Sequence, residues 1–210
     1  EKILLLSGPN SGGKTVVLKS LGLYALMAQC GLFIPAYKAQ FPIYTKFMAD
    51  IGDRQSIEDD LSTFSAHIQN LATIVEQANE NTLILLDELG TGTDPDAGAA
   101  LSRAIMESLI QKNCTVIATT HLGPLKVWAS DEKGIINGGM IFNSEALAPT
   151  YELQLGTPGA SYALEISKRM GLSDDIINRS KELVGDGSVN LENILGQLEK
   201  EHLAAAVSYK

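Results

Sequence analysis

The sequence has few cysteines and no long apolar run. Its two cysteines, Cys30 and Cys114, lie far apart and lack the spacing of metal ligands, which argues against a disulfide framework and a cysteine-based metal site. We expect both to be buried free thiols of a protein in the reducing cytoplasm. No apolar run approaches the roughly 20 residues of a membrane span, so no membrane partner is expected.

Basic residues are also in deficit. There are 16 Lys and Arg against 25 Asp and Glu, giving a formal net charge of −9. A surface that binds the phosphates of nucleic acid is rich in basic residues, and the composition of this chain does not predict such a surface. If the whole protein contacts DNA or RNA, we expect other segments to hold the phosphates. Because Glu1 stands just before a predicted core strand, we expect the chain to be a piece of a longer protein.

Short apolar runs alternate with segments of helical periodicity, which predicts an α/β fold with a mostly parallel sheet covered by helices on both faces. Asp94 is predicted to cap a helix that begins at Pro95. We expect strands at 3–6, 44–49, 82–86, 115–119 and 151–155, and helices starting at 16, 62 or 63, 95, 162 and 174. We expect a core over 1–158, a helical part over 159–185, and a flexible break with an amphipathic helix over 186–210.

The segment from Gly8 to Thr15 carries the strongest functional pattern. It fits G-x-x-x-x-G-K-[ST], the loop that wraps the phosphates of a nucleoside triphosphate, and it lies between a predicted strand and a predicted helix. We predict that Lys14 reaches the β- and γ-phosphates and that the Thr15 hydroxyl ligates Mg²⁺. An accidental glycine-rich turn is the alternative. The predicted nucleotide-binding residues here are Gly8, Pro9, Asn10, Ser11, Gly12, Gly13, Lys14 and Thr15.

Two adjacent carboxylates, Asp87 and Glu88, follow the apolar run 83–86. The carboxyl ends of strands are where α/β sheets place their ligand sites. We predict that Asp87 holds Mg²⁺ opposite Thr15 and that Glu88 accepts a proton from the attacking water. A strand-end turn with solvated acids is the alternative. A glutamate directly after the metal-binding aspartate favours hydrolysis over transfer to another acceptor.

His121 follows another predicted strand and is expected to sense the γ-phosphate, although a lone histidine is more often structural. The other histidines, His67 and His202, are assigned no chemistry, although His67 could lie near the nucleotide of a partner subunit. Ser62 and Thr63 open a predicted helix, where amides and hydroxyls form an anion site. Ordinary helix capping is the alternative for these two residues.

With these residues in view, the chain resembles the ATPase domain of the MutS family, a branch of the ABC-type P-loop ATPases. The resemblance covers roughly residues 1–185. Within the family it is similar to the second branch, MutS-II, because of segment 53–58 and of Asp94-Pro95. The motifs that carry the resemblance are Gly8–Thr15, Asp50-Ile51-Gly52-Asp53, Leu61-Ser62-Thr63-Phe64, Asp87–Thr93, Thr119-Thr120-His121 and Gly159-Ala160-Ser161-Tyr162.

The resemblance implies a head-to-tail homodimer in which ATP lies between Gly8–Thr15 of one subunit and the Ser62-Thr63 region of the other. It also implies one of two roles for the full protein, which are suppression of homologous recombination by acting on branched DNA and splitting of stalled, collided ribosomes with binding to ribosomal RNA. Any endonuclease activity would belong to an Smr domain outside this sequence. The rival interpretation is a clamp or scaffold that binds ATP without hydrolysing it, and the presence of Asp87, Glu88 and His121 argues against it.

Overall fold

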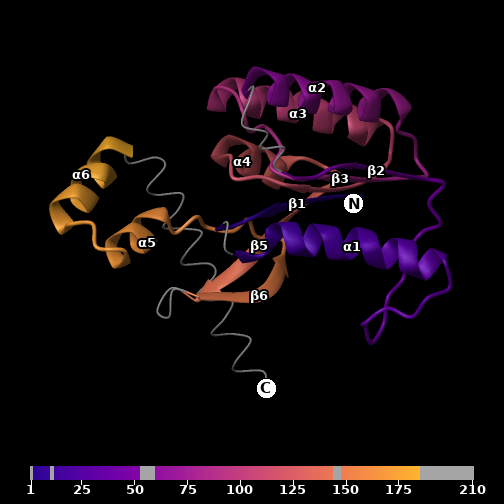
Figure 1. Ribbon diagram of the computed structural model, residues 1–210, viewed down its shortest axis with the longest axis horizontal. Coiled ribbons are helices and arrows are strands. Elements are labelled where there is room, and N and C mark those ends of the chain that lie inside the picture. The colour runs from indigo at the N-terminus through magenta and orange to yellow at the C-terminus, as the bar shows by residue number, and fades with distance from the viewer. Residues whose placement is uncertain (1, 10–11, 53–59, 144–147, 185–210) are drawn as a thin grey trace. The chain divides into compact units, whose positions relative to one another are not determined.

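A computed structural model describes residues 2–9, 12–52, 60–143 and 148–184, with only the backbone at 60–63 and 184. In this part of the chain six strands form one sheet in the order β2-β3-β4-β1-β5-β6 (Figure 1). The pairs β2–β3 and β3–β4 are parallel, and β5–β6 is antiparallel. The predicted α/β class is therefore confirmed.

The strands are β1 (Ile3–Ser7), β2 (Lys46–Asp50), β3 (Thr82–Leu86), β4 (Thr115–Thr119), β5 (Ile135–Asn143) and β6 (Ala148–Leu155). The helices are α1 (Lys14–Gln29), α2 (Asp60–Gln77), α3 (Pro95–Gln111), α4 (Gly123–Asp131), α5 (Ala163–Arg169) and α6 (Asp174–Val184). None of the helices described is long and apolar enough to cross a membrane. The amphipathic helix predicted within 186–210 lies outside the described residues.

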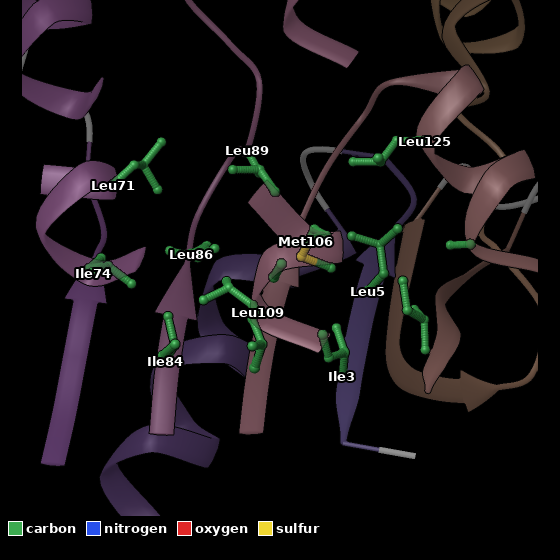
Figure 2. Packing of buried hydrophobic residues seen from close by; sticks show 14 of the residues in the cluster. Ile3, Leu5, Leu71, Ile74, Ile84, Leu86, Leu89, Met106, Leu109 and Leu125 are labelled. Carbon is green, nitrogen blue, oxygen red and sulfur yellow. The ribbon is translucent and has the colours of Figure 1, made fainter. Parts of the chain in front are cut away.

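The chain divides into two compact units. One comprises Glu1–Leu5 and Thr15–Ile136, and the other comprises Leu6–Lys14 and Asn137–Lys210. Within the first unit, α2, α3 and α4 lie on one face of the strands and α1 lies on the other (Figure 1). The core beneath α2, α3 and α4 is apolar and almost fully buried (Figure 2). Its members include Ile3, Leu5, Leu71, Ile74, Ile84, Leu86, Met106, Leu109 and Leu125.

Two predicted helix starts have different outcomes. The cap of α3 is confirmed, because Asp94 Oδ1 accepts hydrogen bonds from the amides of Asp96 and Ala97, both at 3.1 Å, and Pro95 opens the helix. The cap of α2 was placed wrongly. This helix begins at Asp60, so Ser62 and Thr63 lie within its first turn rather than before it.

The pattern of the sequence missed β5 altogether. This strand reads Ile-Ile-Asn-Gly-Gly-Met-Ile-Phe-Asn, and Asn and Gly are depleted in strands. The structure supplies the reason for Gly139. A Cβ atom there would lie 2.9 Å from the Thr157 carbonyl oxygen and 3.0 Å from the Gly159 nitrogen. The backbone at 157–159 therefore approaches so closely that only glycine fits at position 139. This glycine interrupts the side-chain periodicity by which a strand is recognised in the sequence.

The two cysteines differ, contrary to the expectation that both are buried. Cys114 is buried, and its thiol donates to the Leu109 carbonyl oxygen at 3.2 Å, whereas Cys30 is exposed just after α1. Burial raises the pKa of the Cys114 thiol. Only a thiolate reacts rapidly. Cys114 is therefore protected from thiol reagents, because they cannot reach it and because its thiol stays protonated.

We therefore expect maleimide to modify one thiol of the folded protein quickly and the second only in denaturant. Mass spectrometry after tryptic digestion would identify Cys30 as the fast site. The variant Cys30→Ser should abolish fast labelling. Two fast thiols in the native protein would contradict the burial of Cys114.

Candidate functional site

Asp87 stands at the carboxyl end of β3, and several hydrogen bonds fix it there. Its amide donates to the Asp50 carbonyl oxygen at 2.8 Å. Its Oδ1 accepts from the Thr119 hydroxyl at 2.6 Å and from the Thr15 hydroxyl at 3.2 Å. The structure thus brings together Thr15 and Asp87, the two residues predicted as magnesium ligands.

Glu88 follows in a left-handed backbone conformation, with φ of 51°. This region is uncommon for residues other than glycine and costs about 1 kcal/mol or more. The turn is held by Thr119, whose fully buried hydroxyl accepts from the Glu88 amide at 2.7 Å while donating to Asp87. One hydroxyl on β4 therefore positions both acids.

The substitution Thr119→Val, which keeps the shape of the side chain, should test that role. It leaves the Glu88 amide without its acceptor and removes one donor from Asp87, which should lower the free energy of unfolding by about 1–3 kcal/mol. Urea unfolding followed by circular dichroism would measure the change. Thr119→Ser retains the hydroxyl and should lose markedly less stability, whereas Thr119→Val as stable as wild type would contradict the role of the hydroxyl.

The two acids open onto a cleft in the first unit, lined by Thr15, Lys19, Gly52, His67, Asp87, Glu88 and Thr91. His121 follows β4 as predicted and is exposed, but it is not among the residues that line this cleft. His67, to which the sequence assigned no chemistry, does line it. The signal that sequence reasoning missed is Asp50, which ends β2 directly beside the end of β3 and hydrogen-bonds to His67.

The glycine loop belongs to the second unit, where its described residues are Gly8, Pro9 and Gly12 to Lys14. Gly8 and Gly13 have φ of +128° and +88°, a region that disfavours side chains. A Cβ at Gly12 would lie 3.1 Å from the Met140 Cβ, and one at Gly13 would lie 3.2 Å from the Tyr151 ring. These glycines keep the loop backbone free of side chains and close to β5 and β6.

Lys14 ends this loop with its side chain folded back. Its ammonium donates to the Gly8 carbonyl oxygen at 2.8 Å, and the residue is 5 % exposed. At the base of the loop, the buried Ser7 hydroxyl accepts from the Gly159 amide at 2.8 Å. Asn10 and Ser11, also predicted to bind nucleotide, lie outside the described residues, as do the side chains of Ser62 and Thr63.

The donor set fits magnesium better than a metal held by protein alone. In the described parts of the chain no group of three or more His, Cys, Asp or Glu residues could hold a metal ion. Mg²⁺ typically takes one or two protein oxygen ligands and completes its shell with water and substrate phosphates. The Thr15 hydroxyl and Asp87 carboxylate, 3.2 Å apart, supply such a pair, and Thr15 directly follows Lys14 of the phosphate loop.

Comparison with known proteins agrees with the motifs. Residues 4–186 match the family described as MutS domain V. Proteins named "Endonuclease MutS2" from Thermus thermophilus and Ruminiclostridium cellulolyticum are 51 % and 50 % identical to the chain over 97 % and 96 % of its length. A third, from Lacticaseibacillus casei, is 47 % identical over 99 %. The chain spans 27 %, 26 % and 26 % of these relatives, about a quarter of their length.

Proposed function

The chain belongs to the MutS family, in its MutS2 branch, and we propose that it is an ATPase domain that hydrolyses ATP to ADP and phosphate. The observation that carries the proposal is the hydrogen-bonded set of Thr15, Asp87 and Thr119 at the end of β3. It joins the residue that follows the phosphate loop to the acid expected beside the metal. A P-loop ATPase holds Mg²⁺ between these two kinds of residue, so they must lie next to each other.

Binding would begin at the glycine loop. Because glycines have no side chains, the backbone amides of the loop can converge on phosphate oxygens. The first turn of α1 adds the positive end of a helix dipole. Lys14 would exchange the Gly8 carbonyl oxygen for the β- and γ-phosphates. Thr15 and Asp87 would hold Mg²⁺, which supplies electrostatic stabilisation of the charge on the phosphates.

Glu88 is proposed as the general base. It takes one proton from water as the water oxygen bonds to the γ-phosphorus and the bond to the β,γ-bridging oxygen breaks, so that ADP leaves with the electron pair. The proton then passes from Glu88 to phosphate or solvent. His121, exposed two residues after the end of β4, is proposed to sense the γ-phosphate.

We further propose that hydrolysis drives a conformational change in a head-to-tail homodimer. Ser62 and Thr63 lie in the first turn of α2, and the first turn of a helix carries amides that have no acceptor within the helix and suit an anion. In the dimer this turn would face the γ-phosphate held by the other subunit. Loss of that phosphate would remove the electrostatic bridge between subunits, as in other γ-phosphate switches.

Phosphate release from the complete gene product, followed against protein concentration, tests this proposal. Because the dimer is expected to complete the site, the specific activity should rise with concentration and then level off. Activity independent of concentration would contradict trans completion. ATP binding without any phosphate release would favour the rival clamp or scaffold that does not hydrolyse ATP.

The whole protein is proposed to act on nucleic acid, either branched DNA or a ribosome, through segments outside this sequence. The relatives' name includes endonuclease, and that activity is likewise proposed to reside elsewhere. The net charge of −9 supports this assignment, because this domain offers no excess of basic residues to bind phosphates.

A further inference from the structure

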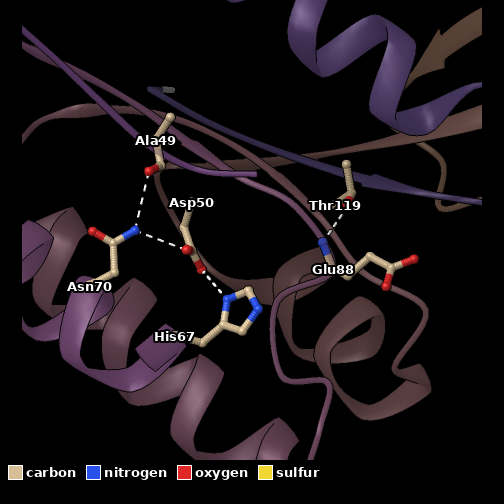
Figure 3. A network of polar contacts seen from close by, with 6 residues as sticks. All are labelled: Ala49, Asp50, His67, Asn70, Glu88 and Thr119. Carbon is tan, nitrogen blue, oxygen red and sulfur yellow. Dashed lines mark hydrogen bonds and ion pairs between the residues drawn. The ribbon is translucent and has the colours of Figure 1, made fainter. Parts of the chain in front are cut away.

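His67 and Asp50 form a hydrogen-bonded pair at the cleft. The His67 Nδ1 atom lies 2.8 Å from Asp50 Oδ2, and the side chains are 29 % and 14 % exposed. The other carboxylate oxygen accepts from Asn70 Nδ2 at 2.8 Å (Figure 3). An ionised carboxylate only accepts hydrogen bonds, so Nδ1 carries the proton that is shared with Asp50. This fixes the orientation of the ring, and in the neutral form of an imidazole with the proton on Nδ1 the lone pair lies on Nε2.

The pair is tied to the same strand ends as the predicted catalytic acids. Asp50 ends β2, which runs parallel to β3 with Asp50 opposite Leu86, and the Asp50 carbonyl oxygen accepts the Asp87 amide. His67 comes from α2 and lines the same cleft as Asp87 and Glu88. The consecutive elements β2 and α2 therefore place an oriented imidazole at the same cleft as the acids.

Asp50 engages Nδ1 of His67, and within the described part of the chain no protein group bonds to Nε2. The His67 side chain is 29 % exposed and lines the cleft, so water or a ligand can reach the ring.

We propose that His67 is a water-positioning residue of ATP hydrolysis, an inference that rests on the proposed function. The attacking water has two protons, and its lone pair must point at the γ-phosphorus. Glu88 accepts one proton outright, while His67 Nε2 accepts a hydrogen bond from the other and gains no proton. Two acceptors on one water leave its lone pair free to attack, the role that an orienting residue has in other phosphoryl-transfer sites.

The proposal requires one local movement. The Glu88 carboxylate points away from the imidazole (Figure 3), so the two acceptors do not yet face one water molecule. Glu88 must change rotamer when nucleotide enters, a movement that needs no rearrangement of Asp50, whose contacts hold the ring.

Two substitutions separate positioning from structure. In His67→Asn the amide can replace Nδ1 and keep the bond to Asp50, but it cannot reach where Nε2 stood. In His67→Gln the longer amide can reach the Nε2 position. We expect His67→Asn, in the complete gene product, to slow single-turnover ATP cleavage by about 10- to 100-fold with ATP affinity and melting temperature nearly unchanged. His67→Gln should recover part of the rate, and Gln69→Ala, an exposed change on α2, should have no effect.

Cleavage by His67→Asn within about twofold of wild type would overturn the inference. So would equal losses of rate, affinity and stability in both His67 variants, because that pattern marks a structural residue. If His67→Asn cleaves normally while Glu88→Gln does not, the inference alone fails. If wild-type protein releases no phosphate at any concentration, the proposed function fails and this inference fails with it.

Discussion

Replacing Glu88 by Gln should leave ATP binding intact and reduce turnover by about 100-fold or more, the contribution typical of a general base. The amide keeps the size of the side chain and cannot accept a proton from water. It should not disturb the turn, because the contacts there use the Glu88 main chain, whose amide donates to Thr119 and whose carbonyl oxygen accepts from Thr91. The loss should therefore appear in kcat and not in nucleotide affinity.

Phosphate release and calorimetric ATP titration, done on the same preparation, would separate these two quantities. Glu76→Gln is a matched control, because it makes the same chemical change at an exposed position on α2. Near-normal turnover in Glu88→Gln would remove this residue from the role of base. A parallel loss of binding would instead assign the effect to the nucleotide site as a whole.

Much of the first unit could be predicted because its signals are local. The strands β3 and β4 are short apolar runs with the predicted bounds. Polar residues predicted to act at the site follow them, such as Asp87 and Glu88 after β3. Asp94 and Pro95 mark the start of α3 by capping chemistry that acts within one turn. In each case the pattern and its physical cause lie within a few neighbouring residues.

The misses depended on contacts between residues far apart in the sequence. Gly139 of β5 is required by its approach to Thr157 and Gly159, and nothing local reveals this. Likewise, His67 looks like an ordinary helical residue until β2 places Asp50 beside it. The role of Thr119, which links Asp87 to Glu88, depends on the pairing of β3 with β4.

Replacing Lys14 by Ala should reduce ATP affinity by at least about 100-fold, because an ammonium that meets two phosphates makes charge-assisted hydrogen bonds worth more than neutral ones. In the structure this ammonium already has the Gly8 carbonyl oxygen as a partner at 2.8 Å. Binding therefore exchanges existing contacts of the ammonium for stronger ones rather than satisfying an unpaired charge. The measured loss is the difference between these two states.

Because Lys14 is buried, the alanine variant could also lose stability through its missing methylene stem. Lys14→Met keeps most of that stem and removes the charge together with the hydrogen bond to Gly8, so it should lose less stability than the alanine variant and bind ATP as poorly. Lys133→Met makes the same change at an exposed site and should bind normally. Calorimetry on the three variants separates charge from packing. Unchanged affinity in Lys14→Met would contradict the phosphate-loop assignment. The glycine loop and the dipole of α1 would then bind a triphosphate without help from the lysine.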